Sequence, residues 1–258
     1  MANKFCESYG APGGDTIVLW GDSHAWAWAP VFYRIAEERK LRVIRFSIGG
    51  CPPLIQARRA DADGKLTSCY TFGNGEQFVD AIKLIKPRQI FIIAYWSLYT
   101  STNSIEAQKV DPAADQHAGS GILEAQLAKT LRALPADTPV TIFRTTPLLV
   151  NDLERGLLRK VKIEPTAAEH ALREADADHA IDEAASTRDH VKVFDPAALM
   201  CSQTCKAIFE GTLMYFDSGH ISAQGALLYK DILLRDFFSS PEGHELHVKD
   251  DIARLSRY

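Results

Sequence analysis

The chain alternates between short apolar runs typical of β-strands and longer stretches whose apolar residues recur at helical spacing. The runs expected to form strands are residues 16–20, 41–47, 89–95, 139–144 and 190–194. The stretches expected to form helices are residues 25–40, 76–86, 122–134, 166–185 and 222–238. The alternation of strands and helices along the chain predicts a parallel sheet with helices on both faces. We therefore expect an α/β fold of three layers, α/β/α and flavodoxin-like, with about five parallel strands.

This alternation occupies most of the 258 residues and leaves short ends. We expect one domain over residues 16–240, an N-terminal extension or linker over 1–15, and a C-terminal tail over 241–258. The 29 basic and 33 acidic residues give a net charge of −4 without a block of one sign, so no nucleic-acid partner is expected. No apolar run reaches the roughly 18–20 residues that a membrane-spanning helix needs.

The first predicted strand leads directly into Gly21-Asp22-Ser23-His24, where the first helix begins. A serine at this turn stands at the carboxyl edge of a parallel sheet, where α/β folds bind their ligands. The helix N-terminus beside it directs backbone N–H groups at a developing oxyanion. Ser23 is therefore a candidate nucleophile. The alternative is purely structural, with Ser23 as the helix N-cap and Asp22 as a turn residue.

A second polar cluster, Asp217-Ser218-Gly219-His220, precedes the last predicted helix. A serine hydroxyl is a weak nucleophile unless a base lies within hydrogen-bond reach. His220 can be that base, and Asp217 in the same turn can hold the imidazole in the required tautomer. An Asp-x-x-His pair on its own is more often a surface turn. Together with Gly-Asp-Ser-His at the other end of the chain, it favours a Ser-His-Asp site.

These two clusters resemble the first and last conserved blocks of the SGNH/GDSL hydrolases. Further blocks are similar to one branch of that superfamily, the extracytoplasmic SGNH domain fused to membrane acyltransferase family 3 proteins, which O-acetylate bacterial surface polysaccharides. The blocks that carry the resemblance are GDSHA (21–25), GGCPPL (49–54), Cys69, AYWSLY (94–99), the Cys201/Cys205 pair and YFDSGHIS (215–222). The resemblance extends from residue 16 to about 235 and implies the SGNH fold.

The resemblance also implies roles for individual residues. Ser23 matches the nucleophile, His220 the general base, and Asp217 the residue that orients the base. The oxyanion donors would be the backbone N–H of Ser23 and that of Gly49 or Gly50.

The third block departs from the family pattern, because residues 94–99 read Ala-Tyr-Trp-Ser-Leu-Tyr and lack the Asn that completes the oxyanion hole. Loss of one such donor costs on the order of 3–4 kcal/mol in well-studied hydrolases. Three interpretations stay open: a weak hydrolase, a backbone donor near Trp96, or a site that is completed only when substrate binds. Weak hydrolysis would suit a transferase, which must keep water away from the acyl group.

Aromatic residues and one histidine near the candidate site suggest sugar binding. His24, Trp96 and Tyr99 are the candidates for substrate contacts, and a structural role is at least as open for each. Trp26 and Trp28 are predicted to pack in the core, since aromatic side chains are large hydrophobic groups. No other histidine has the spacing of a metal ligand, so neither a metal nor a cofactor is expected.

The five cysteines include two pairs that are close in sequence. We expect two local disulfides, Cys51–Cys69 and Cys201–Cys205, which leaves Cys6 unpaired. Free buried thiols are one alternative. A zinc site is another, and it is disfavoured because only the second pair has the spacing of zinc ligands.

The resemblance implies an O-acetyltransferase that moves an acetyl group through a Ser23 acyl-enzyme onto hydroxyls of a bacterial cell-surface polysaccharide, such as an O-antigen or lipopolysaccharide-type glycan. The acetyl group would come from a fused or partner membrane acyltransferase domain. The alternatives are a freestanding carbohydrate acetyl esterase and a catalytically silent glycan-binding module, which the missing Asn favours. The cysteine pairs, and an N-terminus without an export signal, predict a monomeric soluble piece of a longer protein. That protein would be periplasmic and attached to the inner membrane.

Overall fold

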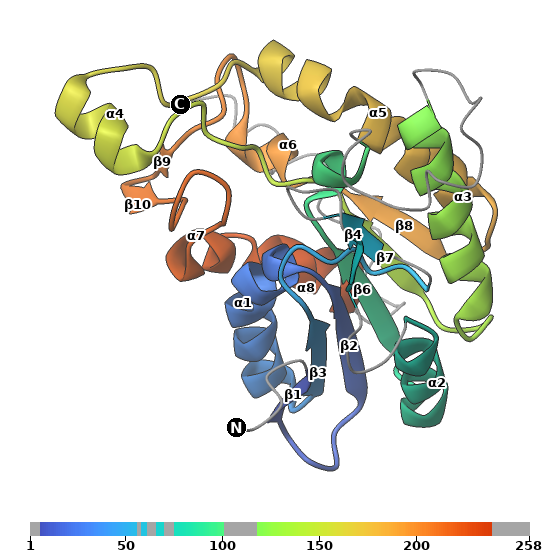
Figure 1. Cartoon of the computed structure of the whole chain (residues 1–258). Helices are drawn as coiled ribbons and strands as arrows, with labels where there is room; N and C mark the ends of the chain where they lie inside the picture. Colours follow the sequence, from blue (N-terminus) through green and yellow to red (C-terminus); the bar gives the residue numbers. More distant parts are fainter. Residues whose placement is uncertain (1–5, 56–57, 61–65, 70–74, 101–117, 239–258) are drawn as a thin grey trace.

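The computed structural model describes residues 6–55, 58–60, 66–69, 75–100 and 118–238 (Figure 1). Its centre is a six-stranded sheet in the order β1-β3-β2-β6-β7-β8. The strands are β1 (Cys6–Gly10), β2 (Thr16–Gly21), β3 (Arg42–Ser47), β6 (Gln89–Ile93), β7 (Val140–Phe143) and β8 (Val191–Phe194). The five strands that the sequence predicts are all parallel, and they follow the flavodoxin-like order. The expected fold class is therefore confirmed.

The sixth strand, β1, lies in the segment that was expected to be an extension or linker. It pairs antiparallel with β3, with Cys6 opposite Phe46. Its five residues are all exposed, so the segment lacks the apolar pattern that marks a buried strand. Glu7 on β1 forms an ion pair with the buried Arg45 of β3. Residues 6–10 therefore belong to the sheet, and the other expected domain boundaries stay predictions; the C-terminal tail lies outside the described residues.

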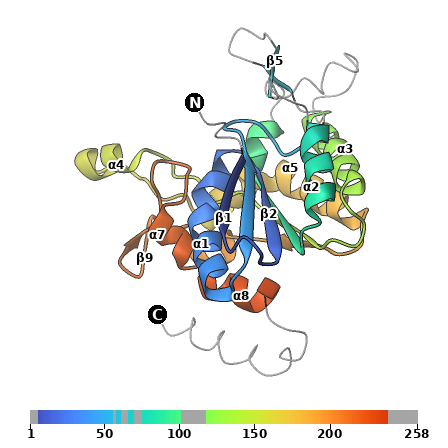
Figure 2. The same cartoon turned by 90° about the horizontal axis from the view of Figure 1, so that it is seen from below.

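Helices cover both faces of the sheet (Figures 1 and 2). One face carries α1 (Ser23–Arg39), α7 (Ala223–Leu227) and α8 (Lys230–Phe238), and the other carries α2 (Gly75–Ile85), α3 (Ala118–Ala133) and α5 (Ala167–Ser186). Alternate residues of β2 point to opposite faces, so Ile17 and Leu19 pack in one core and Val18 and Trp20 in the other. None of the helices in the described part of the chain is long and apolar enough to cross a lipid bilayer.

Short elements lie between the main strands and helices. They are β4 (Arg58–Ala60), β5 (Leu66–Ser68), η1 (Trp96–Tyr99), α4 (Leu153–Arg159), α6 (Ala197–Met200), β9 (Ile208–Phe209) and β10 (Thr212–Leu213). The last predicted helix is split into α7 and α8. Ser222 is the N-cap of α7, and its hydroxyl accepts the N–H of Gly225 at 2.9 Å.

The strand order reverses between β2 and β6, because the chain continues from β2 to β3 on one side and from β6 to β7 on the other. Loops that leave two such neighbouring strands diverge, and the crevice between them is the usual ligand site of open α/β sheets. The segments that follow β2 and β6 are residues 22–24 and 94–99. The fold thus brings the first and third sequence blocks together at one edge of the sheet.

Candidate active site

The structure brings Ser23, Asp217 and His220 together, although 197 positions separate the serine from the histidine. Ser23 is the first residue of α1, and its Oγ lies 2.7 Å from Nε2 of His220. Nδ1 of His220 lies 2.7 Å from Oδ2 of Asp217. When Nδ1 carries its proton and donates it to the carboxylate, Nε2 is left to accept the serine proton. The arrangement is the relay that a serine nucleophile requires.

A tight loop holds Asp217 and His220 in this geometry. Oδ1 of Asp217 accepts the backbone N–H of Gly219 at 2.8 Å and that of His220 at 2.7 Å. The N–H of Phe216 closes the loop by donating to the carbonyl of His220 at 2.8 Å. Partial burial acts to raise the pKa of Asp217, but the backbone N–H groups of His220 and Gly219 and the His220 imidazole outweigh it and lower the pKa. Asp217 is therefore ionised at neutral pH and can stabilise an imidazolium.

Asp22 has a structural role that the sequence did not predict. It is the N-cap of α1, and its Oδ1 accepts the N–H of His24 at 2.8 Å. Its Oδ2 accepts the N–H of Tyr95 at 2.9 Å and the hydroxyl of Tyr99 at 2.7 Å. Only 1 % of Asp22 is exposed, so these three donors stabilise a buried carboxylate. The structural alternative for Ser23 is thus wrong, because Asp22 caps the helix and the Ser23 hydroxyl contacts His220.

The backbone near the missing Asn has no N–H to offer an oxyanion at residues 95 and 96. The N–H of Tyr95 is bound to Asp22, and the N–H of Trp96 donates to Oγ1 of Thr145 at 3.1 Å. The N–H groups of Tyr95 and Trp96 are therefore not the backbone donor near Trp96 that would replace the Asn, and a donor elsewhere in this segment stays a prediction. These bonds instead fix the segment after β6 against α1 and the segment after β7.

The turn after β3 lies at the same edge of the sheet as Ser23 and contains Gly49 and Gly50. The N–H of Ile48 donates to the carbonyl of Gly21 at 3.2 Å, and the N–H of Cys51 donates to the carbonyl of Ile48 at 3.1 Å. Gly50 has a φ of 67°, a conformation that favours glycine. The turn is thus tied to the end of β2, and the oxyanion role of Gly49 or Gly50 stays a prediction.

Trp26, Trp96 and Tyr99 are placed differently from the sequence expectation. Trp96 and Tyr99 are 0 % and 1 % exposed, and the Trp96 indole donates to the carbonyl of Phe143 at 2.7 Å. Both are core residues, so the expected substrate contacts are wrong for them. Trp28 is buried as expected, whereas Trp26, which was also expected in the core, is 54 % exposed.

His24, the third candidate for substrate contact, lies beside His220. Its ring centroid is 5.0 Å from that of His220 and 5.3 Å from that of Tyr95, and 3 % of the residue is exposed. Burial lowers the pKa of His24, although Asp22 acts to raise it. The buried ring of His24 thus packs beside the His220 imidazole, and this burial argues against the expected substrate contact.

We expect His24 to make the fold less stable in mild acid. The pKa of His24 in the folded protein lies below its value of about 6.5 in the unfolded chain. Between these two values the unfolded state binds more protons than the folded state. The free energy of unfolding therefore falls as the pH falls. Urea unfolding at about pH 7 and about pH 5 measures the loss. His24→Phe should lose less stability over this interval than the wild type, and His179→Phe, at an exposed position of α5, should lose as much. An equal loss in wild type and His24→Phe would contradict this account.

The two cysteine pairs have different outcomes. The expected Cys201–Cys205 disulfide is present, with an S–S distance of 2.01 Å. Cys51 and Cys69 are both buried and adjacent, with Sγ of Cys51 3.6 Å from the carbonyl oxygen of Cys69. Their pairing stays a prediction. Cys6, expected to be unpaired, is an exposed free thiol on β1.

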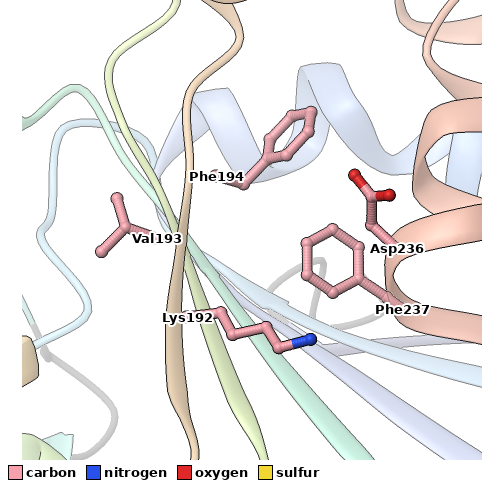
Figure 3. A pocket seen from close by; sticks show the side chains of 5 residues that line it. All are labelled: Lys192, Val193, Phe194, Asp236 and Phe237. Atoms are coloured by element: carbon pink, nitrogen blue, oxygen red, sulfur yellow. The ribbon is translucent and has the colours of Figure 1, made fainter. Parts of the chain in front are cut away.

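A separate pocket lies between β8 and α8 (Figure 3). It is lined by Lys192, Val193, Phe194, Asp236 and Phe237. The Lys192 ammonium lies 5.8 Å from the centroid of the Phe237 ring. None of the triad residues lines this pocket, so it does not belong to the candidate active site.

Comparisons with known proteins concern the family and the fold of the chain. A family model described as "SGNH domain (fused to AT3 domains)" matches residues 2–235. The periplasmic domain of a lipopolysaccharide acetyltransferase from Salmonella ser. Paratyphi A has a similar structure, with a TM-score of 0.61 and 16 % identity over 88 % of this chain and 85 % of that one. A family two carbohydrate esterase from Clostridium thermocellum gives a TM-score of 0.49 and 11 % identity, over 87 % of this chain and 65 % of that one.

No curated protein matches the sequence. At these identities the solved structures show a likeness of fold. The family model, in contrast, spans nearly all of the chain and includes Ser23, Asp217 and His220. The chain therefore belongs to the family of SGNH domains that are fused to AT3 domains.

Proposed function

We propose that this domain is an O-acetyltransferase that acts on hydroxyls of a bacterial cell-surface polysaccharide. The relay from Asp217 through His220 to Ser23 carries the proposal. His220 takes the proton of Ser23, whose Oγ attacks the acetyl carbonyl, and the leaving group departs with that proton. A sugar hydroxyl then gives its proton to His220 and attacks the acetyl-serine. Ser23 leaves with the proton from His220, and the acetyl ester stays on the sugar.

The oxyanion donors in this proposal are the N–H of Ser23, at the N-terminus of α1, and that of Gly49 or Gly50. The site then has one donor fewer than the family pattern, at a cost of about 3–4 kcal/mol. Positioning of both reactants can lower a barrier by about 7–11 kcal/mol, and a bound sugar gains this advantage where bulk water does not. The missing donor slows both reactions, and the positioning of a bound acceptor then favours acetyl transfer over hydrolysis.

The surroundings of the triad support a large acceptor. The side chains of His220 and Asp217 are 29 % and 44 % exposed, so a polymer can reach them without entering a deep cavity. The family's fusion to AT3 domains supports a membrane domain as the source of the acetyl group. The similar domain from Salmonella is named as periplasmic and as part of a lipopolysaccharide acetyltransferase, and the Cys201–Cys205 disulfide suits an oxidising compartment. We accordingly place the domain in the periplasm, tethered to the inner membrane and monomeric.

A carbohydrate acetyl esterase is the second candidate, because the same exposure admits water to the acetyl-serine. The two are separated by giving the protein p-nitrophenyl acetate together with a de-O-acetylated O-antigen polysaccharide. The transferase predicts new acetyl esters on the polysaccharide, measured by NMR, and less free acetate than without it. Free acetate as the sole product, at a rate that the polysaccharide does not change, would refute the transferase and leave the esterase.

A further inference from the structure

Three aromatic side chains are exposed among those that the structure describes, namely Tyr9, Trp26 and Phe216. Tyr9 lies on the edge strand β1, where its ring stacks on Tyr33 at a centroid distance of 4.4 Å. Trp26 and Phe216 are 54 % and 76 % exposed, and each lies within three residues of a member of the triad. The sequence predicted the reverse for the tryptophans, since Trp26 was expected in the core and Trp96 was a candidate for stacking.

Trp26 and Phe216 belong to the same two segments as the triad, namely α1 and the loop that contains Asp217 and His220. Trp26 follows Ser23 by three positions on α1, so the two side chains are neighbours on one face of the helix. Phe216 precedes Asp217, and its N–H is bonded to the carbonyl of His220. Tyr215 beside it points inward and donates its hydroxyl to the carbonyl of Pro147 at 2.6 Å, which leaves Phe216 on the solvent side of the loop.

We propose that Trp26 and Phe216 form the acceptor subsite, an aromatic platform that holds a pyranose ring beside Ser23. A pyranose presents polarised C–H groups on its faces and hydroxyls around its rim, so its face covers an aromatic ring while its rim stays hydrated. The half-exposed Asp217–His220 pair lies on the same loop, where a rim hydroxyl can give up its proton. The platform rests on the proposed function, because it assigns the second substrate of that reaction.

The four tryptophans of the chain provide a direct readout. Trp20, Trp28 and Trp96 are at most 2 % exposed, and the indoles of Trp28 and Trp96 are bonded to Thr146 and to the carbonyl of Phe143. In an NMR titration of the Ser23→Ala protein with de-O-acetylated O-antigen polysaccharide, the Trp26 indole N–H signal should shift and saturate. The other three indole signals should stay in place. Trp26→Phe identifies the signal.

Matched variants in the Ser23→Ala background measure the strength of the platform. Trp26→Ala and Phe216→Ala should each weaken polysaccharide binding about tenfold, which corresponds to about 1.4 kcal/mol. Leu84→Ala removes a side chain that is 85 % exposed on α2 and should bind like the parent protein. Circular dichroism shows whether each variant is folded.

Three outcomes would overturn the platform: unchanged affinity in both folded aromatic variants, no shift of the Trp26 signal, or a shift that appears only when a membrane acyltransferase domain is added. The last would assign the two rings to a protein interface. Because Ser23→Ala is used throughout, binding is measured without turnover. If the wild type transfers no acetyl group but Ser23→Ala binds the polysaccharide through Trp26, the proposed function alone is refuted. If the wild type transfers acetyl groups but binding does not depend on Trp26, the platform alone is refuted.

Discussion

Replacing Ser23 by Ala should reduce the turnover of p-nitrophenyl acetate on the order of 10⁶-fold, because the change removes the hydroxyl that is proposed to form the acyl-enzyme. The folded state should lose only the hydrogen bond from Ser23 to His220, which is worth about 1 kcal/mol. Release of p-nitrophenol and the midpoint of thermal unfolding measure the two effects. Turnover near the wild-type rate in a folded Ser23→Ala protein would contradict the assignment, and so would a catalytically silent wild type.

The control for this change is Ser186→Ala. It removes a hydroxyl that donates to the carbonyl of Glu183 at the C-terminal end of α5, outside the site. This variant should keep the full rate. An equal loss in both variants would show that the assay responds to general damage and not to the nucleophile.

The largest effect on stability is expected from Asp22→Ala. The change leaves the N–H of His24, the N–H of Tyr95 and the hydroxyl of Tyr99 without their acceptor inside the protein. Each buried donor left unsatisfied costs about 1–3 kcal/mol, so the free energy of unfolding should fall by about 3–5 kcal/mol. For a domain of this size that lowers the thermal midpoint by about 6–20 °C. Turnover should fall as well, since Asp22 fixes the backbone that carries Ser23.

Asp152→Ala is the matched control, because Asp152 is also the N-cap of a helix but its side chain makes no capping bond to α4. It should change the midpoint little. Tyr99→Phe removes one of the three donors to Asp22 and should cost about 1–2 kcal/mol. A wild-type midpoint in Asp22→Ala would contradict the role of Asp22 as the link between α1 and the segment after β6.

The sequence predicts the five parallel strands because their apolar runs are long enough to reveal a buried sheet. β1 gives no such signal, since all five of its residues are exposed at the edge of the sheet. The triad was predictable because Gly-Asp-Ser-His follows a predicted strand and Asp-x-x-His lies in the loop before the last predicted helix. The alternation of strands and helices places both at one edge of the sheet. The structure supplies the 2.7 Å contacts of His220 with Ser23 and Asp217.

Contacts between distant segments account for what the sequence did not predict. Two of the three partners of Asp22, Tyr95 and Tyr99, lie 73 and 77 positions away, and no local pattern connects them to it. Trp96 lies in a short 3-10 turn, whose single turn has no periodicity to reveal its buried face. Trp26 lies in the first turns of α1, at the end of the sheet where the site opens, so an apolar residue at core spacing is exposed there.

The central claim is that Ser23 carries the acetyl group during the reaction. The most direct measurement is mass spectrometry of peptides from protein that is quenched in acid during turnover of p-nitrophenyl acetate. The account predicts one acetyl group on the peptide that contains Ser23, its loss when polysaccharide is added, and its absence from Ser23→Ala. Acetylated polysaccharide formed without any acetyl group on Ser23, or formed equally by Ser23→Ala, would contradict it.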